Sequence, residues 1–333
     1  MTPARTPLGR VAGLLMLLFL ATAAEVSAQQ PGKTYRVGYL AAAARSTNQA
    51  QLAEFQQGMR DLGYVEGRNL VLEMRFADGK FDRLPQLARD LVQLNPDAIF
   101  VSTTPASLAI KAATPTIPIV FVAVADPVGV GLVPSVARPG GNVTGITHIV
   151  AEMTGKRLEL LKEMVPSASR IAVLVNPDDP NATVQLKNAE AAAKPLGVQL
   201  QPIVTVRGAS DLAGAFDQIA RSGAAAALRM VDPQGAPLRT RTTELAMKHR
   251  LPVMFTFRED VEAGGLAAYG ANLPAQYRQA ATMMDKILRG ARPGDLPVEQ
   301  ASKFELVVSR KTARALGLTI PPSVLLRADQ VID

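Results

Sequence analysis

Short apolar runs alternate with amphipathic stretches along most of this chain. The runs at 99–101 and 119–122 are continuously apolar and rich in β-branched side chains, which is typical of strands buried on both faces of a parallel sheet. Between such runs, apolar residues recur every three or four positions, for example at Leu84, Leu87 and Leu91, which predicts helices with one buried face. The alternation therefore predicts an α/β fold with parallel sheets and right-handed crossovers.

The same alternation occurs twice, before and after a segment rich in glycine and proline at 134–145. We expect this segment to be the first crossing between two lobes, because it has no apolar periodicity. The predicted fold class is α/β, with two doubly wound parallel-sheet lobes and a cleft between them. The first lobe is expected at 33–147 with a return segment at about 273–300. The second is expected at 148–272 with a late strand and helix at about 301–325.

The first residues have the pattern of an export signal. Arg5 and Arg10 precede an apolar stretch at 11–24, and the small-residue sequence VSA follows at 26–28. This order predicts a cleaved secretory signal peptide at 1–28 and a periplasmic protein, and the apolar stretch is shorter than the roughly 20 residues of a membrane span. The chain has no cysteine, so we expect no lipid anchor on cysteine, no disulfide and no thiol chemistry.

The charge pattern argues against nucleic acid as a partner. The formal net charge is +7 at pH 7, but basic residues are interspersed with acidic ones, as at Lys156, Arg157 and Glu159. There is no basic run, no tryptophan, and only 5% of the residues are aromatic, so side chains that could stack on bases are scarce. A basic but ordinary protein surface is the better interpretation.

Catalytic and metal-binding patterns are missing from the sequence. The two histidines, His148 and His249, are far apart and belong to no HExxH motif, and no GxSxG, SxxK, P-loop or GxGxxG motif occurs. We therefore expect a binding protein that is not an enzyme and that uses no cofactor or metal. His249 is expected to be a solvated cation at the end of a helix. His148 follows the expected crossing, where a contact in the hinge or cleft stays open.

Polar side chains follow several of the predicted strands. Because the carboxyl ends of parallel strands share one edge of a sheet, these side chains are candidates for ligand contacts. Each of them could equally cap a helix or close a turn. The candidates, together with two aromatic residues near strand ends, are Ser46, Ser102, Thr103, Thr104, Asp126, Asn176, Asp232, Phe257 and Tyr269.

Two segments carry a likeness to a known family. VARPGGNVTG at 136–145 and LGLTIPPSVLLRAD at 316–329 resemble segments of the ABC transporter substrate-binding proteins of the tryptophan/tyrosine type. The likeness extends over almost the whole chain after the signal peptide. It implies the periplasmic-binding-protein type I fold, capture of a small solute, delivery of that solute to the membrane subunits of an ABC permease, and no chemistry on the solute.

The resemblance also implies an aromatic or other amino acid as ligand. In amino-acid-binding proteins of this fold, hydroxyls and helix N-termini of the first lobe hold the carboxylate, which suits Ser102 and Thr104. An acidic residue often holds the ammonium group, which suits Asp126 or Asp232. The chain offers few aromatic partners for an aromatic ligand, with Tyr39, Phe257 and Tyr269 as the candidates.

The same features fit three other functions to different degrees. A periplasmic sensor module that hands its ligand to a receptor would have the same sequence pattern, and only a neighbouring permease gene would separate the two. A hydrolase or isomerase on this fold is disfavoured because no nucleophile is paired with a base. A sugar-responsive DNA repressor shares the lobe fold, but it would need an N-terminal helix-turn-helix where this chain has a signal-peptide pattern.

Overall fold

The computed structural model describes residues 33–148, 150–232 and 235–333. The predicted signal peptide at 1–28 lies outside the described residues. The described chain forms two β-sheets, each with helices on both faces. None of the helices described is both long enough and apolar enough to cross a membrane.

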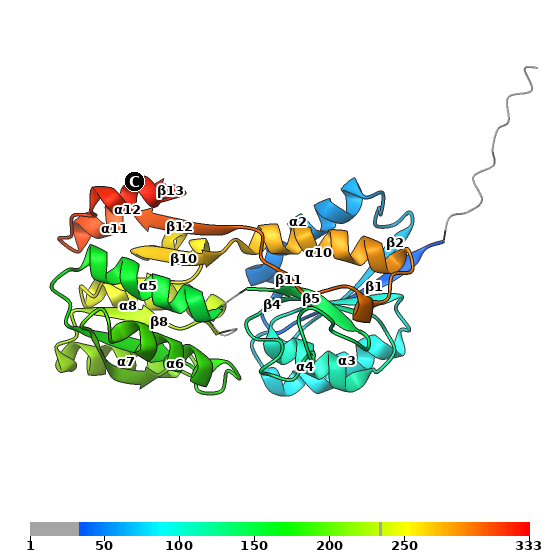
Figure 1. Cartoon of the computed structure of the whole chain (residues 1–333), viewed down its shortest axis with the longest axis horizontal. Helices are drawn as coiled ribbons and strands as arrows, with labels where there is room; N and C mark the ends of the chain where they lie inside the picture. Colours follow the sequence, from blue (N-terminus) through cyan, green and yellow to red (C-terminus); the bar gives the residue numbers. More distant parts are fainter. Residues whose placement is uncertain (1–32, 149, 233–234) are drawn as a thin grey trace, which may run out of the picture. The chain divides into compact units, whose positions relative to one another are not determined.

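The first sheet has six strands in the described part of the chain, in the order β11-β5-β4-β3-β1-β2, and all its neighbouring strands are parallel. Its strands are β1 (Tyr35–Ala41), β2 (Leu70–Phe76), β3 (Ala98–Ser102), β4 (Ile119–Val124), β5 (Val143–Thr147) and β11 (Glu299–Gln300). Figure 1 shows helices on both faces of this sheet. One face is covered by α2 (Gln49–Asp61) and α10 (Leu273–Leu288), the other by α3 (Leu84–Gln93) and α4 (Thr104–Ala113). Three short 3-10 helices are η1 (Arg45–Asn48), η2 (Phe81–Arg83) and η3 (Pro293–Asp295).

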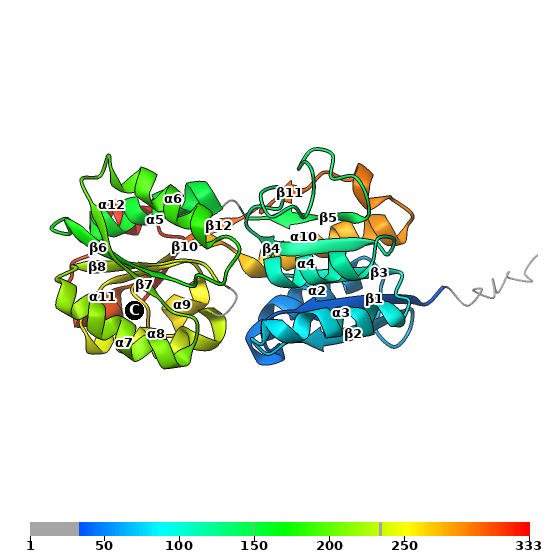
Figure 2. The same ribbon diagram turned by 90° about the horizontal axis from the view of Figure 1, so that it is seen from below.

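The second sheet has seven strands among the described residues, in the order β13-β12-β10-β9-β8-β6-β7. They are β6 (Arg170–Val175), β7 (Gln199–Thr205), β8 (Ala226–Arg229), β9 (Val253–Phe255), β10 (Ala267–Ala271), β12 (Phe304–Ser309) and β13 (Gln330–Ile332). Neighbouring strands are parallel except that β12 runs antiparallel to β10. Figure 2 shows the helices around this sheet. One face carries α5 (Val150–Met164), α6 (Ala182–Ala193) and α12 (Pro322–Arg327), and the other carries α7 (Ala209–Ser222), α8 (Gly235–Lys248) and α9 (Arg258–Glu262). The short helix α11 (Arg310–Ala315) follows β12, and its Ala313 belongs to the same core cluster as α5 and α6.

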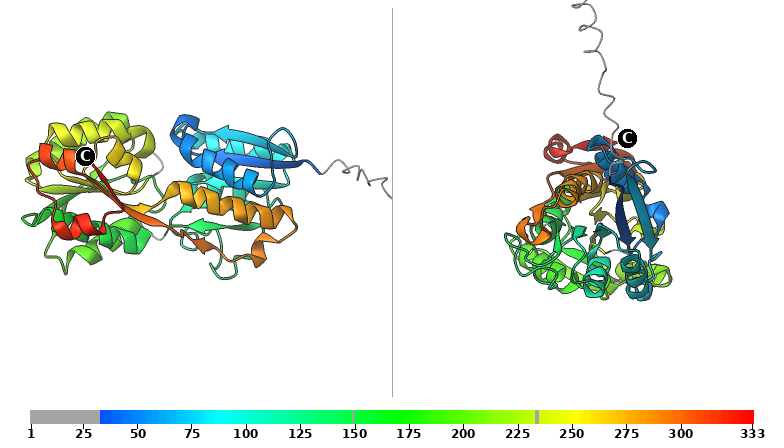
Figure 3. Two further views of the ribbon diagram at one scale, coloured as in Figure 1. Left: turned by 90° about the horizontal axis from the view of Figure 1, so that it is seen from above. Right: turned by 90° about the vertical axis from the view of Figure 1, so that its right-hand side faces the viewer.

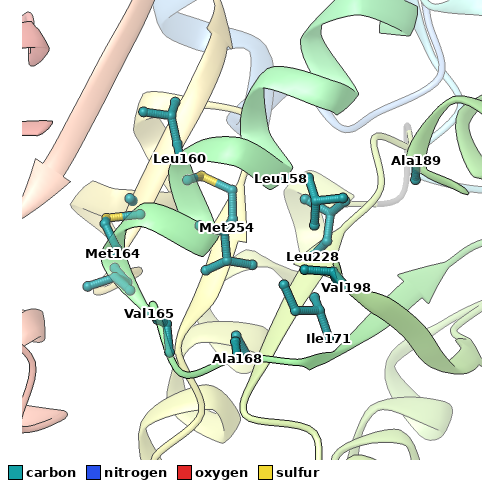
Figure 4. Packing of buried hydrophobic residues seen from close by; sticks show 14 of the residues in the cluster. Leu158, Leu160, Met164, Val165, Ala168, Ile171, Ala189, Val198, Leu228 and Met254 are labelled. Carbon is teal, nitrogen blue, oxygen red and sulfur yellow. The ribbon is translucent and has the colours of Figure 1, made fainter. Parts of the chain in front are cut away.

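Both faces of each sheet are buried, which explains why the strands read as continuous apolar runs. Along β6, Ile171 and Val173 belong to the core on the α5 side, whereas Ala172 and Leu174 belong to the core on the α7 side, because successive strand residues point to opposite faces. Figure 4 shows the α5 side, where side chains of α5 pack against Leu228 and other residues of the central strands.

The order of the strands places a topological switch point in each sheet. The chain leaves β1 for β2 on one side and then returns to β3 on the other, and β6 is flanked in the same way by β7 and β8. Ligands of open α/β sheets bind at the carboxyl ends of the strands beside such a point. The fold thus directs attention to the residues that follow β1, β3, β6 and β8.

One expectation about the chain path is wrong. The segment at 134–145 is not the crossing between the lobes, because its last residues begin β5, which pairs with β4 in the first sheet. Gly145 allows this pairing, since a Cβ atom there would lie 2.2 Å from the carbonyl oxygen of Phe121. Gly145, which close packing requires, made the sequence of β5 resemble that of a loop, so the strand was not predicted. The lobe boundaries given above remain a proposal.

Candidate functional site

A cavity opens at the carboxyl ends of the strands of both sheets. Its empty volume is about 950 Å³, part of which is open to solvent, a size that accommodates a small molecule. The first sheet and its helices contribute Ala43, Thr47, Asn48, Gln51, Ser102, Thr103, Thr104, Ala123, Ala125, His148, Leu273 and Tyr277. The second contributes Asp179, Asn181, Gln185, Arg229, Met230, Val231, Asp232, Gly235, Ala236, Arg239, Phe255, Thr256, Phe257 and Asp260.

The turn from β3 into α4 brings three hydroxyls to the cavity. Ser102 is the last residue of β3, and Thr103 and Thr104 open the helix. Thr103 has a φ of 82°, a left-handed conformation that is strained for a β-branched residue. Its carbonyl accepts hydrogen bonds from the backbone N–H and the hydroxyl of Ser107. The Thr103 hydroxyl itself is buried and has no hydrogen-bond partner among the residues described.

Two buried tyrosines orient the hydroxyl of Ser102. The Tyr277 hydroxyl donates to Ser102 Oγ at 2.7 Å, and the hydroxyls of Tyr39 and Tyr277 are 3.1 Å apart. Since the one proton of Tyr277 goes to Ser102, Tyr39 must donate to Tyr277. Burial raises the pKa of both tyrosines, so they stay protonated. The proton of Ser102 is therefore free to serve a third group in the cavity.

On the second sheet, two of the three cavity aspartates form buried ion pairs. Arg229 Nη2 lies 3.1 Å from Asp232 Oδ2, and Arg239 Nε lies 3.0 Å from Asp260 Oδ1. The third, Asp179, accepts hydrogen bonds from the backbone N–H and the side-chain amide of Asn181. Burial, followed by the charge of Asp232, raises the pKa of Asp179 to about 6 against the hydrogen bonds from Asn181.

A buried cation stands behind the cavity wall. Arg157 of α5 has no exposed surface, and its guanidinium donates to the hydroxyls of Thr256 and Thr154. It forms no ion pair with any residue that the structure describes, and burial lowers its pKa to about 10. Burial and the nearby Arg157 charge lower the pKa of His148 to about 4. The ring of His148 is therefore neutral, and neither nitrogen has a partner within the described chain.

Among the described residues, two hydrogen bonds connect the two sides of the cavity. Asn181 Nδ2 donates to Thr104 Oγ1 at 3.2 Å, and Gln51 Nε2 donates to Glu259 Oε1 at 3.0 Å. Each joins a side chain near the first sheet to one near the second. Polar side chains of both sheets thus enclose one space.

The structure brings together five of the nine residues that the sequence singled out: Ser102, Thr103, Thr104, Asp232 and Phe257 line the cavity. Asp126 does not, because its carboxylate accepts from the backbone N–H of Gly129 at 2.8 Å and closes a turn. Ser46 lies in η1 beside the lining residue Thr47. Asn176 is buried outside the lining; its Oδ1 accepts from the N–H of Asp178, and its Nδ2 lies 3.5 Å from Oδ1 of the lining residue Asp232. Tyr269 packs against the α5-side core. A ligand contact of each of these four residues stays a prediction.

Several cavity residues were not predicted from the sequence. Asp179 and Asn181 lie four and six residues beyond the end of β6. Arg229 is the last residue of β8, so its position in the sequence indicates a core strand. Tyr277 lies on the return helix α10, far from any strand end in sequence. A signal for the loop existed in the polar sequence NPDDPN after β6. In the described chain no cluster of three or more histidine or acidic side chains could hold a metal ion.

Two α/β sheets whose strand ends share one ligand-sized cavity define the type I periplasmic-binding-protein class. Residues 44–332 match the family model described as ABC transporter substrate binding protein. The chain therefore belongs to the family of ABC transporter substrate binding proteins.

Known proteins agree with this assignment. A tyrosine-binding protein of Clostridioides difficile is 27% identical over 266 residues, which cover 79% of this chain and 75% of the relative. A conserved domain protein of Vibrio cholerae is 32% identical, with a TM-score of 0.84 over 90% of this chain and 100% of that one. An ABC domain of Streptococcus pneumonia solved in complex with L-Trp is 25% identical, with a TM-score of 0.83 over 90% of this chain and 100% of its own.

Proposed function

We propose that this protein captures an amino acid in the cavity and delivers it to an ABC permease. The observation that carries the proposal concerns two hydroxyls that line the cavity, that of Ser102 at the end of β3 and that of Thr256 after β9. The Ser102 oxygen accepts a hydrogen bond from buried Tyr277, and the Thr256 oxygen accepts one from buried Arg157. The hydroxyl protons of Ser102 and Thr256 have no acceptor among the residues described. Both protons are therefore available to a ligand carboxylate, and such charge-assisted bonds are the stronger kind.

The surroundings of these hydroxyls favour an anion. In the first turn of α4, the backbone N–H groups of Thr104 and Ala106 have no partner among the described residues, and a helix N-terminus attracts a negative charge. Arg157 adds a full positive charge, because its guanidinium donates a hydrogen bond to the Thr256 hydroxyl. Because Arg157 has no carboxylate partner in the described chain, a ligand carboxylate would offset the cost of burying that cation.

The ligand's side chain has room beside apolar groups. Phe255 and Phe257 line the cavity together with Met230 and Leu273, so an aromatic or aliphatic side chain would meet apolar contacts. Tyr269, the other aromatic candidate near a strand end, is partly buried and packs against the α5-side core outside the cavity lining. Aromatic amino acids are a reasonable first choice because the relatives above are a tyrosine-binding protein and a domain solved with L-Trp.

The cellular setting follows from the signal-peptide pattern at 1–28. We propose a cleaved signal, a periplasmic protein without a lipid anchor, and the membrane subunits of an ABC permease as its partner. The cavity holds groups that bind, and it lacks a paired nucleophile and base among its described lining residues, so the protein releases its ligand unchanged.

Isothermal titration calorimetry with each of the common amino acids tests this function. We expect at least one, with L-tryptophan and L-tyrosine tried first, to bind with a dissociation constant in the micromolar range or below. Ser102→Ala should weaken binding about tenfold or more, since a hydrogen bond to a charged group is worth about 1.5–3 kcal/mol. Ser167→Ala, an exposed serine outside the cavity lining, is the matched control. Absence of binding for every amino acid, or equal affinities of the two variants, would overturn the proposal.

A further inference from the structure

Asp179 is the aspartate of the cavity lining that lacks an arginine partner among the described residues. Of the three aspartates that line it, Asp232 and Asp260 each have an arginine within 3.1 Å. Asp179 has no ion pair with any residue that the structure describes. A buried carboxylate without a cation is costly, and such groups are usually paired. The imbalance points to a positive charge that arrives with the ligand.

Of the two carboxylate oxygens of Asp179, Oδ1 accepts two hydrogen bonds, whereas Oδ2 has only one long contact. Its Oδ1 accepts from the backbone N–H of Asn181 at 3.0 Å and from Asn181 Nδ2 at 2.9 Å. Its Oδ2 has a single long contact, 3.5 Å from Gln185 Nε2. A carboxylate offers about four acceptor positions. The turn that Asp179 stabilises thus needs only Oδ1, and Oδ2 retains capacity for another donor.

Asn181 supplies a second, independent acceptor. Its Nδ2 lies between Asp179 Oδ1, which can only accept, and the hydroxyl of Thr104, so the orientation of the amide is fixed. The opposite atom, Oδ1, is buried and receives no hydrogen bond within the described chain. Asn181 is only 6% exposed and lines the cavity. An acceptor in this position requires a donor.

We propose that Asp179 Oδ2 and Asn181 Oδ1 form the subsite for the cationic nitrogen of the ligand, the α-ammonium group of an amino acid. This inference rests on the proposed function and replaces Asp126 and Asp232 as the expected ammonium contacts. Asp126 closes a turn outside the cavity, and Asp232 is neutralised by Arg229. An ammonium group has three N–H donors and matches two acceptors at one point.

The position of the subsite in the fold supports the assignment. Asp179 follows β6 and Asp232 follows β8, so both lie at the switch point of the second sheet, where ligands of such sheets bind. The negative charge of Asp232 adds to burial in raising the pKa of Asp179. A ligand cation beside both carboxylates would relieve this repulsion.

The subsite also explains how both sheets recognise one ligand. Asn181 contacts Thr104 at the start of α4, on the side where Ser102 lies. The Asn181 side chain is thus anchored to the wall that holds Ser102, one of the two hydroxyls offered to the ligand carboxylate. A zwitterion would satisfy both walls, whereas a carboxylic acid without an amino group would leave Asp179 unpaired.

The test compares amino acids with their deaminated analogues on the full protein. The probes are L-tryptophan and 3-(indol-3-yl)propionate, and L-tyrosine and 3-(4-hydroxyphenyl)propionate, measured by calorimetry. The variant is Asp179→Asn, which keeps shape and removes charge. Its matched control is Asp178→Asn, because the side chain of Asp178 is 58% exposed and faces Arg207.

We expect wild type and Asp178→Asn to prefer the amino acid over its analogue by about 100-fold, and Asp179→Asn to lose most of that preference by binding the amino acid more weakly. Asp179→Asn should bind the deaminated analogue no worse than wild type, which shows that the cavity is intact. An undiminished preference in Asp179→Asn overturns the subsite alone. Failure of every amino acid to bind wild type overturns the proposed function, and the subsite with it.

Discussion

At the scale of single residues, the cavity depends on buried groups that set the direction of hydrogen bonds. In Tyr277→Phe, Ser102 loses the donor that engages its oxygen, so its proton is no longer held toward the cavity. We expect about tenfold weaker amino acid binding, corresponding to about 1.4 kcal/mol. Calorimetry at constant pH measures it.

Tyr39→Phe is the control for this change. It removes a hydroxyl from the same buried chain but leaves the Tyr277 donation to Ser102 in place, so its affinity should stay within about twofold of wild type. If both variants lose affinity equally, the direction assigned to the hydrogen bonds is wrong.

Arg157 is a further buried residue beside the cavity, and its proposed role in binding lowers the stability of the protein. Its cation is fully buried without an ion pair in the described chain, and replacing such a charge by an apolar side chain of similar volume is often stabilising. We expect the free energy of unfolding of Arg157→Met to be about 1 kcal/mol higher than that of wild type. We also expect the variant to bind amino acids at least tenfold more weakly. Urea unfolding and calorimetry on the same samples measure both. A loss of stability together with unchanged affinity would contradict the assigned role.

The candidate site was only partly predictable from the sequence, for a physical reason. Strand periodicity locates the loops at the sheet edge, and Ser102 and Thr104 follow from it directly. It cannot tell which side chain of a loop turns outward. Asp126 and Asp179 both follow strands, yet the first closes a turn with Gly129 while the second lines the cavity.

At the scale of elements, the return helix α10 depends on a glycine in α2. The two helices lie side by side in Figures 1 and 3, and a Cβ atom at Gly58 would lie 2.7 Å from the Cβ of Ala281. We expect Gly58→Ala to lower the free energy of unfolding by about 1–3 kcal/mol, because overpacking forces the helices apart. Thermal or urea unfolding measures the change.

Gly214 in α7 offers the matched comparison, since a Cβ atom there would meet nothing within 4 Å. In an exposed helix position alanine is favoured over glycine by about 1 kcal/mol, so Gly214→Ala should raise the free energy of unfolding. The same substitution thus has opposite signs in two helices. Equal signs would mean that the α2–α10 contact is looser than the structure indicates.

Most elements of the fold follow from apolar periodicity, because both sheets are buried on both faces. The elements that escaped are those without a full apolar run. The strand β5 contains Gly145, and α9, α12, β11 and β13 are each only two to six residues long. Their formation depends on partners distant in sequence, as when β13 pairs with β12, and no local pattern records such partners.

At the scale of the whole molecule, two cavity groups make stability depend on pH in opposite directions. Burial raises the pKa of Asp179 from 3.8 to about 6. Between these values the native state keeps a proton that the unfolded state has lost, so stability falls as pH rises. Burial lowers the pKa of His148 from 6.5 to about 4. The unfolded state then holds the extra proton, so stability rises with pH through nearly the same window. Each effect is about 3 kcal/mol.

Because the two effects oppose each other, the wild type hides them and single variants reveal them. Between pH 4 and pH 6.5, the free energy of unfolding of Asp179→Asn should rise by about 3 kcal/mol relative to that of wild type, because the variant has no buried carboxylate that ionises. His148→Gln should change in the opposite sense: its free energy of unfolding should rise relative to wild type as pH falls toward 4, because glutamine takes up no proton on unfolding, whereas His148 does. Urea unfolding of the three proteins at several pH values, without ligand, measures the differences. Other titrating groups cancel in these differences, so parallel stability curves for all three proteins would show that neither group is buried as the structure places it.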